Sequence, residues 1–385
     1  MALPDGVHGA CDPRFSAVAG VLGRQLSTGA HAGAAVAVRH RGRAVVDIWG
    51  GTFARDTLAV SFSTTKGPVA LAAHMALERA GIGYATPVAA LWPEFGRRGK
   101  DAVTVGQLLC HEAGVPQIRD AVGDVAAFAD WDTMVAAVQE LPPLWAPGTA
   151  NGYHAITWGW LAGELVRRVD GRRVDDFLAE EVAGPLDLDG CFLATPPAER
   201  HRIAPLGFDP AVAALPRLED LLPPDSFTLR AFPSPGDVVD FVNSEGGLGA
   251  CAPAISGAFT ARSLATIYAA LERGGSLDGV GLLRPETVSA ATTVQNTRPD
   301  LVLLVPMHWR LGFMGGGLGP AAVPTTGRRR GAFGHAGFGG SSAMADPSSG
   351  VAAAVTLDRL SLDLLGDDRA RAVLGAAVAA AEDNA

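Results

Sequence analysis

Lysine is almost absent from this chain of 385 residues. Only Lys66 and Lys100 occur, so 29 of the 31 basic residues are arginines. An arginine stays protonated in a protein, whereas the surroundings of a lysine can shift it to the neutral amine. A chain with this bias is expected to keep lysine where arginine cannot do the same work. Lys66 follows Ser63 by three residues, and this pair predicts a nucleophile with its base.

Cysteine is also scarce, and its spacing fits neither a zinc site nor a redox pair. The four cysteines, Cys11, Cys110, Cys191 and Cys251, are far apart and form no Cys-x-x-Cys. Free buried thiols are therefore expected, as in a reducing compartment. The start of the chain, Met1 to Asp5, lacks a basic segment followed by an apolar run, and no stretch reaches the ~18 uninterrupted apolar residues of a membrane span. These absences predict a soluble, cytoplasmic protein with no signal peptide and no membrane partner.

Positive charge and several well-known motifs are missing too. The net charge is −9 and the pI is about 5.5, which argues against a nucleic-acid partner because such a partner needs a basic face. The one dense basic run, Arg328-Arg329-Arg330, is interpreted as a solvated loop. There is no Gly-x-Ser-x-Gly, no P-loop, no Gly-x-Gly-x-x-Gly after a strand and no His-Glu-x-x-His. The sequence thus predicts neither a cofactor nor a metal.

Strand-like segments lie at both ends of the sequence, and helix-like segments fill the middle. Two apolar runs, Ala34–Val38 and Ala44–Trp49, flank a short turn with a glycine and predict a β-hairpin. Further strands are expected at Trp309–Met314, Ser341–Ala345 and Val351–Leu357. Helices are expected at 13–28, Ser63–Ala80, Val103–Cys110, Trp131–Glu140, Ile156–Val169, Arg262–Arg273 and Leu365–Ala381. Residues 205–260, rich in proline and glycine, are expected to form long loops, which often belong to a binding site.

This order predicts an α/β (α+β) fold with one antiparallel sheet built from both ends of the chain and flanked by helices. Residues 1–75 and 255–385 are expected to form the sheet domain. Residues 76–254 are expected to form a mainly helical domain with long loops, inserted between the two halves. The active site is expected between the two domains.

Ser63 and Lys66 have the spacing of neighbours on one face of a helix. The amino end of a helix carries partial positive charge, which disfavours a second positive charge there, and burial lowers the pKa of a lysine further. A neutral Lys66 can then accept the proton of Ser63 as the serine attacks a carbonyl, with the Ser63 backbone N–H as one oxyanion donor. The alternative is that Ser-x-x-Lys occurs here by chance.

Tyrosine is as scarce as lysine, with only Tyr84, Tyr153 and Tyr268. Tyr84 lies in a turn, and Tyr268 lies within an expected helix, where core packing explains it. Tyr153 stands on a Pro/Gly loop just before a helix, so its phenol can approach Ser63 and Lys66. The alternative for Tyr153 is a wall residue with its hydroxyl on a backbone carbonyl.

A glycine-rich cluster near the end of the chain is the third candidate part of a site. Five glycines occur between residues 331 and 340, around His335. Glycine in or beside a strand often permits close approach of a ligand to the backbone. The alternative is a bulged or edge strand in which His335 is a satisfied polar residue.

Taken in order, these clusters resemble motifs of the serine β-lactamase and DD-peptidase superfamily, and most closely of the family VIII carboxylesterases, which have a class C β-lactamase-like fold. The similar stretches are Ser61-Phe62-Ser63-Thr64-Thr65-Lys66-Gly67, Leu108-Leu109-Cys110-His111-Glu112-Ala113-Gly114, Pro147-Gly148-Thr149 with Gly152-Tyr153-His154-Ala155, and Gly334-His335-Ala336-Gly337-Phe338-Gly339-Gly340. The resemblance implies that Ser63 is the nucleophile of an acyl-enzyme. It implies that Lys66 and Tyr153 activate it and protonate the leaving group. It also implies that the backbone N–H of Phe338 is the second oxyanion donor and that His335 and Gly337 contact the substrate.

Two departures from the β-lactamase pattern bear on the substrate. Ala155 stands where β-lactamases carry an asparagine that contacts the amide side chain of the substrate, and His335 stands where they carry a lysine. Both favour a neutral small-molecule ester, and the apolar content of residues 205–260 suggests an apolar pocket. The alternatives that stay open are an acyltransferase with a small-molecule acceptor, a β-lactamase or DD-peptidase-like amide hydrolase, and a non-catalytic relative that binds a ligand. The sequence does not indicate an oligomeric state.

Overall fold

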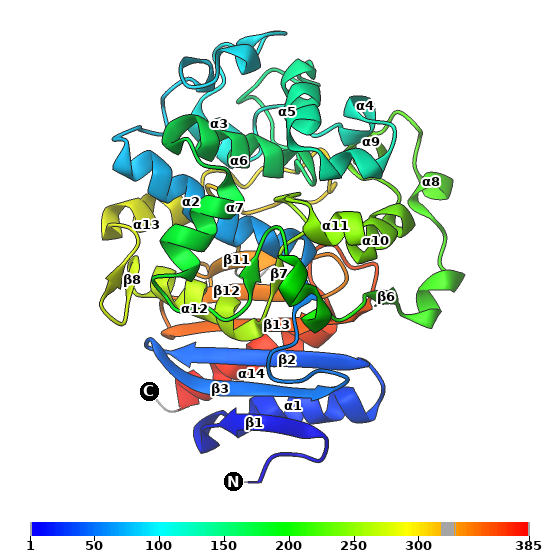
Figure 1. The fold of residues 1–385 in the computed structure, drawn as a ribbon, viewed down its shortest axis with the longest axis vertical. Coiled ribbons are helices and arrows are strands. Elements are labelled where there is room, and N and C mark those ends of the chain that lie inside the picture. The colour runs from blue at the N-terminus through cyan, green and yellow to red at the C-terminus, as the bar shows by residue number, and fades with distance from the viewer. Residues whose placement is uncertain (1, 317–326, 328, 384–385) are drawn as a thin grey trace.

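A seven-stranded antiparallel sheet forms the core of the computed structural model, which describes residues 2–316, 327 and 329–383 (Figure 1). Arg328 of the basic run therefore lies outside the described residues. The strand order is β1-β3-β2-β13-β12-β11-β10. The strands are β1 Val7–Cys11, β2 Gly33–His40, β3 Arg43–Gly51, β10 Met314–Gly315, β11 Phe333–Ala336, β12 Ser342–Asp346 and β13 Val351–Leu357. The sheet is thus built from both ends of the chain, as the sequence predicted.

The central strands β2 and β13 consist mainly of apolar residues, which suits their position in the middle of the sheet. Every residue of β13 is buried, and so are the first six residues of β2, because both faces of these strands are covered. β2 and β3 form the predicted hairpin, and Arg41 and Gly42 connect them with φ angles of 51° and 80°. Two positive φ angles are typical of the tight turn whose twist matches that of the strands.

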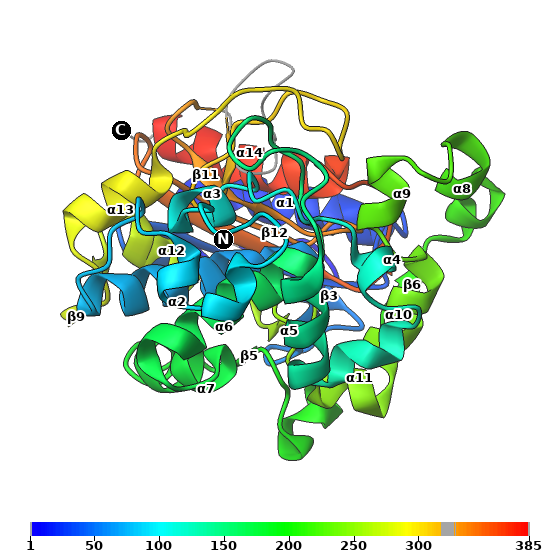
Figure 2. The ribbon, with the colours of Figure 1, turned by 90° about the horizontal axis from the view of Figure 1, so that it is seen from above.

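Helices cover the two faces of the sheet (Figure 2). Helices α1 (Ser16–Ser27) and α14 (Asp368–Asp383) pack against each other on one face, while α12 (Ala261–Glu272) packs on β2, β12 and β13 from the other. The Thr260 hydroxyl accepts the N–H of Ser263 and so caps the first turn of α12.

Helix α2 (Lys66–Arg79) lies between this sheet layer and the helical part of the chain and packs closely on α6 (Thr157–Asp170). Twelve of its 14 residues, Lys66 to Leu77, are buried, so the helix is covered on all sides. The helix was predicted from Ser63, and a 3-10 turn at Phe62–Thr65 leads into it. The nucleophile candidate therefore sits on a turn at the amino end of a central buried helix.

The other elements are short and gather mostly in the upper part of Figure 1. The remaining α-helices are α3 Val105–Leu109, α4 Ile118–Ala121, α5 Trp131–Glu140, α7 Val174–Leu178, α8 Leu218–Leu221, α9 Phe227–Ala231, α10 Pro235–Asn243, α11 Glu245–Gly249 and α13 Pro285–Thr292. The small sheets pair β4 (Ala59–Val60) and β5 (Cys191–Phe192) with β7 (Ala258–Phe259), β6 (Gly207–Phe208) with β14 (Arg359–Leu360), and β8 (Ser276–Leu277) with β9 (Val280–Gly281). The boundaries of the two expected domains stay a prediction.

Two expectations about secondary structure were wrong. Residues 205–260 hold helices α8 to α11 instead of long loops, since serine caps and a proline start short helices there: Ser226 and Ser244 accept backbone N–H groups, and Pro235 opens α10. Helices of four to nine residues leave too little periodicity to recognise in a sequence.

The other error is the strand expected at Trp309–Met314. The chain folds back at Gly312, which has a φ of 86°, so Trp309 forms a bridge with Met314 and only Met314–Gly315 joins the sheet. The interior glycine, which permits this turn, breaks an apolar run that otherwise looks continuous.

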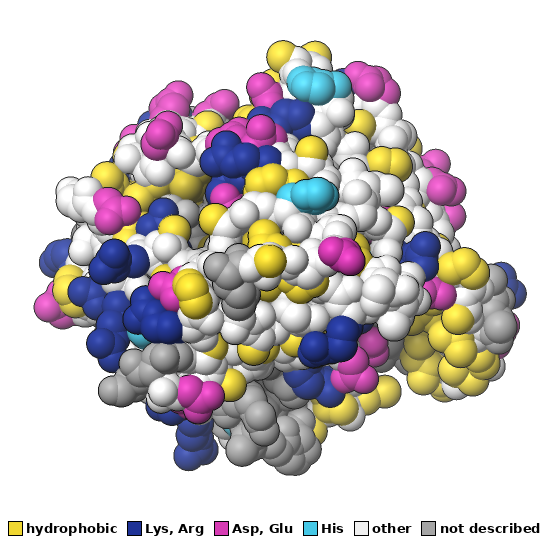
Figure 3. Space-filling model, turned by 90° about the horizontal axis from the view of Figure 1, so that it is seen from below, with side chains coloured by type: hydrophobic (Ala, Val, Ile, Leu, Met, Phe, Trp, Pro, Cys, Tyr) yellow, Lys and Arg dark blue, Asp and Glu magenta, His cyan; other side chains and the backbone are white. Residues whose placement is uncertain are grey.

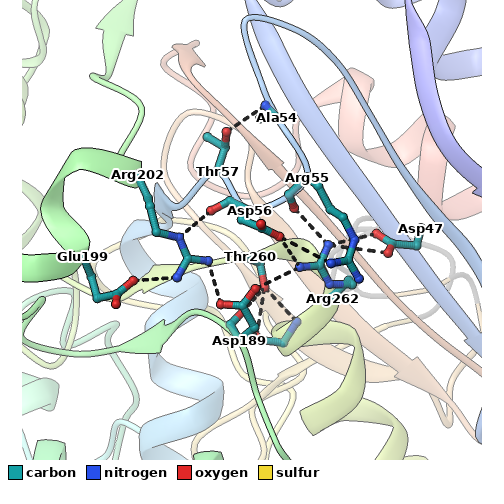
Figure 4. A network of polar contacts seen from close by, with 11 residues as sticks. Asp47, Ala54, Arg55, Asp56, Thr57, Asp189, Glu199, Arg202, Thr260 and Arg262 are labelled. Atoms are coloured by element: carbon teal, nitrogen blue, oxygen red, sulfur yellow. Dashed lines mark hydrogen bonds and ion pairs between the residues drawn. The ribbon is translucent and has the colours of Figure 1, made fainter.

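A network of ion pairs ties the segment before the nucleophile turn to its surroundings (Figure 4). Arg262, at the start of α12, contacts the carboxylates of Asp47, Asp56 and Asp189. Arg202 in turn pairs with Asp189 at 2.8 Å and donates to the backbone carbonyl of Asp56. Each exposed pair contributes about 0–1 kcal/mol, so the network adds little stability pair by pair and mainly connects Asp56, in the segment before β4, to the two arginines.

Two further expectations concern free thiols and membrane spans. All four cysteines are free, and all but the partly exposed Cys11 are buried. Among the described residues, no helix combines the length and the apolar character needed to span a membrane.

Candidate active site

Ser63 lies on the 3-10 turn Phe62–Thr65, which follows β4. The turn is fixed by the Ser61 N–H, which donates to the Gly257 carbonyl at 2.8 Å, and by the Thr65 hydroxyl, which accepts the Gly257 N–H at 3.1 Å. Phe62, just before Ser63, has a φ of 43°, a conformation that is uncommon outside glycine and is often found at functional sites. The chain thus holds a strained backbone at the residue that precedes the candidate nucleophile.

Lys66 is completely buried and its amine contacts three oxygen atoms. Nζ lies 3.0 Å from Ser63 Oγ, 2.7 Å from the Ala155 carbonyl and 3.3 Å from the Ala254 carbonyl. Burial lowers the pKa of Lys66 far below its usual value, and within the described part of the chain no carboxylate pairs with it. A neutral amine has two N–H bonds for the two carbonyls and one lone pair, which then faces the Ser63 hydroxyl. Burial without a carboxylate partner among the described residues, and not the number of oxygen contacts, favours a neutral base over a cation here.

Tyr153 also contacts Ser63, and its ring lies beside Lys66, with Nζ 5.0 Å from the ring centroid. Its hydroxyl lies 2.8 Å from Ser63 Oγ, and not on a backbone carbonyl. Burial raises the pKa of the Tyr153 phenol, although the hydrogen bond to Ser63 opposes the effect. The phenol is therefore protonated and donates to Ser63. Its ring stacks on Trp309 with centroids 5.3 Å apart and an interplanar angle of 15°.

The segment after β11 lies close to the turn that carries Ser63. Gly337 passes so close to the turn that a Cβ at this position would lie 2.4 Å from the Ser61 carbonyl oxygen. The next ring, Phe338, packs edge-on against Phe62 with centroids 5.5 Å apart. From 337 to 340, only the N–H of Phe338 has no hydrogen-bond acceptor among the described residues. It is thus available to an oxyanion, together with the N–H of Ser63.

His335 lies beneath the site. It is fully buried, its Nδ1 lies 2.9 Å from the Ala336 carbonyl, and its Nε2 has no partner among the described residues. Burial lowers the pKa of His335 to about 3, so the ring is neutral. Neither His335 nor Gly337 is among the residues that line the cavity next to Ser63, so their contact with a substrate stays a prediction.

A cavity of about 410 Å³ opens beside Ser63, Tyr153 and Phe338. Its other lining residues are mainly apolar and come largely from residues 208–238 and from two leucines near the end of the chain. They are Phe62, Ala155, Ile156, Phe208, Val212, Leu215, Pro216, Arg217, Leu218, Glu219, Phe232, Pro233, Ser234, Pro235, Gly236, Val238, Ile255, Leu362 and Leu364. The apolar pocket expected from residues 205–260 is therefore present.

The outer wall of this cavity projects from the body of the protein. Figure 3 shows hydrophobic side chains gathered on the lobe at the right of its face, which residues 207–222 form in Figure 1. Leu215 and Leu221 of this lobe are 52% and 62% exposed. An ion pair of 2.6 Å between Arg119 and Glu219 ties the lobe to α4.

Sequence reasoning missed three parts of the site. The Ala155 and Ala254 carbonyls contact Lys66, and a backbone carbonyl leaves no signal in residue type. Asp300 is buried and accepts the Tyr153 N–H at 3.0 Å, but a lone aspartate between apolar residues has no motif that could have pointed to it. Among the described residues, no group of three or more His, Cys, Asp or Glu side chains is assembled for a metal ion.

Comparison with known proteins gives consistent results. A family model described as Beta-lactamase matches residues 18–378. The chain is 35% identical, over 384 residues, to the Esterase/beta-lactamase LipL of Mycobacterium tuberculosis, an alignment that covers 94% of this chain and 86% of that protein.

Solved structures agree over nearly the whole length. A family VIII carboxylesterase superposes with a TM-score of 0.86 at 30% identity, over 97% of this chain and 99% of that one. A penicillin-binding protein homologue from Caulobacter crescentus superposes with a TM-score of 0.82 at 35% identity, with the same coverage.

Proposed function

The chain belongs to the β-lactamase family, and on that premise we propose that it hydrolyses carboxylic esters through an acyl-enzyme on Ser63. The observation that supports this most strongly is the position of Ser63 Oγ, 3.0 Å from a buried amine and 2.8 Å from a buried phenol. The names of the relatives, an esterase/β-lactamase and a family VIII carboxylesterase, point to the same chemistry.

In the first half of the proposed reaction, Ser63 Oγ attacks the carbonyl carbon of the ester. The lone pair of neutral Lys66 takes the hydroxyl proton, which a permanently charged arginine could not do. The backbone N–H groups of Ser63 and Phe338 stabilise the negative charge on the former carbonyl oxygen.

The tetrahedral intermediate then breaks its bond to the alcohol oxygen. Tyr153 gives its proton to the departing alcohol and recovers one from Lys66, so Lys66 is neutral again when the acyl-enzyme has formed. In the second half of the reaction, water takes the place of Ser63 as the nucleophile and Ser63 takes the place of the alcohol as the leaving group. The acid is then released. The raised pKa of Tyr153 supports the role of acid, because the phenol holds its proton until an alkoxide needs it.

Three features favour a neutral ester over a β-lactam. Ala155 offers its carbonyl to Lys66 and has no side-chain amide for the substrate. His335 is neutral and does not line the cavity, so it offers no positive charge to a substrate carboxylate. The cavity walls are mainly apolar, which suits an ester with an apolar acyl or alcohol group.

A second candidate function is transfer of the acyl group to an alcohol or amine. The size and apolar lining of the cavity favour it, because an organic acceptor gains from burial there while water does not. Hydrolysis of β-lactams or peptides is the third alternative, and no feature of the cavity favours it.

The test compares the wild-type protein with Ser63→Ala on a panel of p-nitrophenyl esters and a chromogenic cephalosporin. We expect ester hydrolysis to fall by at least about 10³-fold in the variant, with unchanged circular dichroism, and little turnover of the cephalosporin by either protein. Ser63→Ala protein that is folded and still active would refute the mechanism. Failure of a fluorophosphonate to label the wild type would favour a non-catalytic binding protein.

Acyl transfer has its own arm in the same assay. Alcohols and amines of increasing apolar size are added at a fixed ester concentration, and the ester or amide formed is quantified against the acid. If the ratio of transfer product to acid does not rise with the acceptor, acyl transfer is excluded as a significant activity.

The remaining proposals concern architecture and location. We propose that residues 1–75 with 255–385, and residues 76–254, are two units with the site between them. We also propose a cytoplasmic location, supported by the free cysteines. Limited proteolysis and cell fractionation test these two statements.

A further inference from the structure

Asp300 is a buried carboxylate that the reaction above does not use. It is 1% exposed and lies in the segment between α13 and β10. Its Oδ1 accepts the backbone N–H groups of Tyr153, Val302 and Leu303 at 3.0, 2.9 and 2.9 Å. Its Oδ2 accepts the side-chain N–H groups of Asn151 and Trp309 at 3.3 and 2.8 Å. All five contacts are donors, and within the described residues no arginine, lysine or histidine forms an ion pair with Asp300.

The two oxygen atoms of this carboxylate reach Tyr153 by separate routes. Oδ1 holds its backbone directly. Oδ2 holds the indole of Trp309, whose ring stacks on the phenol. The Asn151 carbonyl also accepts the N–H of Leu301, so the loop before Tyr153 is paired with the segment around Asp300. One buried side chain thus sets both the backbone and the ring plane of the tyrosine.

We propose that Asp300 is a positioning residue that holds the Tyr153 hydroxyl against Ser63 through these two routes. The proposal rests on the proposed function, in which Tyr153 protonates the leaving alcohol. A displacement of about 1 Å in such a group costs on the order of 10²-fold in rate. Asp300 therefore controls the acid step without touching the substrate.

The charge of Asp300 acts in the same direction. After burial, which is the larger cause, the negative charge of Asp300 raises the pKa of Tyr153 and keeps the phenol protonated. Among the residues that the structure describes, the other titratable groups around this ring are Lys66, His111, His154 and His335. Burial lowers the pKa of each of the three histidines and leaves them neutral.

Asp300→Asn separates the two routes. The amide oxygen can keep the three backbone contacts of Oδ1, while the amide nitrogen faces the donors of Asn151 and Trp309 and loses both bonds. Trp309→Phe is the complementary variant, because it keeps a stacked ring and removes only the indole N–H. Asp346→Asn changes another fully buried carboxylate, which lies on β12 outside the site, and serves as the control.

The readout is the ratio of kcat for two esters of the same acid, one of p-nitrophenol and one of a simple alkyl alcohol. p-Nitrophenolate leaves without a proton, whereas an alkoxide needs one. We expect Asp300→Asn to lower kcat about 10- to 100-fold on the alkyl ester and less than about threefold on the p-nitrophenyl ester, with KM nearly unchanged. Trp309→Phe should show the same bias at smaller size, and Asp346→Asn should show none.

An equal loss on both esters, or no loss, would overturn the proposal and leave Asp300 a purely structural residue. If Asp300→Asn does not fold, Trp309→Phe decides by the same ratio. Failure of the proposed function is distinguishable, since it would appear as retained activity in Ser63→Ala, whatever the Asp300 variant does.

Discussion

The two lysines of this chain occupy two buried environments that differ in what surrounds the amine. The Lys66 amine has the Ser63 hydroxyl and two backbone carbonyls within 3.3 Å. The Lys100 amine donates to the Leu141 carbonyl at 2.6 Å and lies 5.3 Å from the centre of the Phe95 ring. Burial lowers the pKa of both, to about 8 for Lys100, where the nearby Glu140 charge partly opposes the shift.

The comparison distinguishes the two lysines by the groups around each amine, since burial is common to both. Both amines are shielded from water, but among the described residues only Lys66 has a hydroxyl whose proton it can accept. In the same part of the chain no carboxylate raises the pKa of Lys66, whereas the charge of Glu140 raises that of Lys100. Lysine scarcity therefore indicated two special positions, and the serine three residues earlier distinguished the catalytic candidate from the structural one.

The largest expected effect separates these two lysines directly. Lys66→Arg puts a permanent charge where a neutral amine is needed, so kcat on an ester should fall by about 10³-fold or more. Lys100→Arg should keep activity within about twofold, because its amine does not contact the site. Circular dichroism confirms folding, and Lys66→Met, which fits the buried site without a charge, should lose as much as Lys66→Arg. Similar losses at both positions would break the comparison.

A smaller effect is expected at Tyr153, whose phenol contacts Ser63 beside Lys66. Tyr153→Phe removes the proton donor 2.8 Å from Ser63 and should lower kcat on alkyl esters by about 10²-fold. Tyr84→Phe is the matched control, since its hydroxyl bonds His74 Nδ1 away from Ser63. A Tyr153→Phe enzyme with wild-type rates on alkyl esters would show that Lys66 works without the phenol.

The smallest effects concern stability at acid pH, which depends on buried histidines, including two that lie close to Lys66. Burial lowers the pKa of His154 and His335, close to Lys66, to about 3, and of His31 and His74 to about 4. Below pH ~6.5 these histidines bind protons in the unfolded chain but stay neutral in the folded chain. As the pH falls from ~6.5 towards the folded-state pKa, the free energy of unfolding should therefore fall by up to about 1.4 kcal/mol per pH unit for each such histidine.

Urea unfolding at pH 7 and at pH 5.5 measures this slope. His335→Asn and His154→Asn should each flatten it. A free energy of unfolding that does not change between these pH values would contradict the assignment of neutral buried histidines.

The sequence predicted the parts of the fold whose residues carry their own pattern. The β2–β3 hairpin, α5 and β13 each have a complete apolar period and clear ends, and α5 and β13 have the predicted bounds. β1 was missed because its sequence, Val7–Cys11, has one buried residue and a glycine, and only pairing with β3 makes it a strand. Such edge strands depend on tertiary contacts that a local pattern does not contain.

The same division holds in the site. Ser63, Lys66 and Tyr153 belong to rare residue types or recognisable spacings, and the structure brings Lys66 and Tyr153 within hydrogen-bond distance of Ser63 Oγ. Asp300 acts from a position with no motif, and the Ala155 and Ala254 carbonyls act through backbone atoms. Their roles depend on how distant segments meet, which no local feature of the sequence specifies.

The most direct test of the central claim is the protonation state of Lys66 itself. Because the chain has only two lysines, protein labelled with ¹³C at lysine Cε gives two NMR signals, and Lys100→Arg assigns them. We predict that Lys66 has the chemical shift of a neutral amine at pH 7.5, while Lys100 titrates with a pKa of about 8. A Lys66 signal that stays in the ammonium form at pH 7.5 and titrates near 10.5 would contradict the claim that this lysine is the base that activates Ser63.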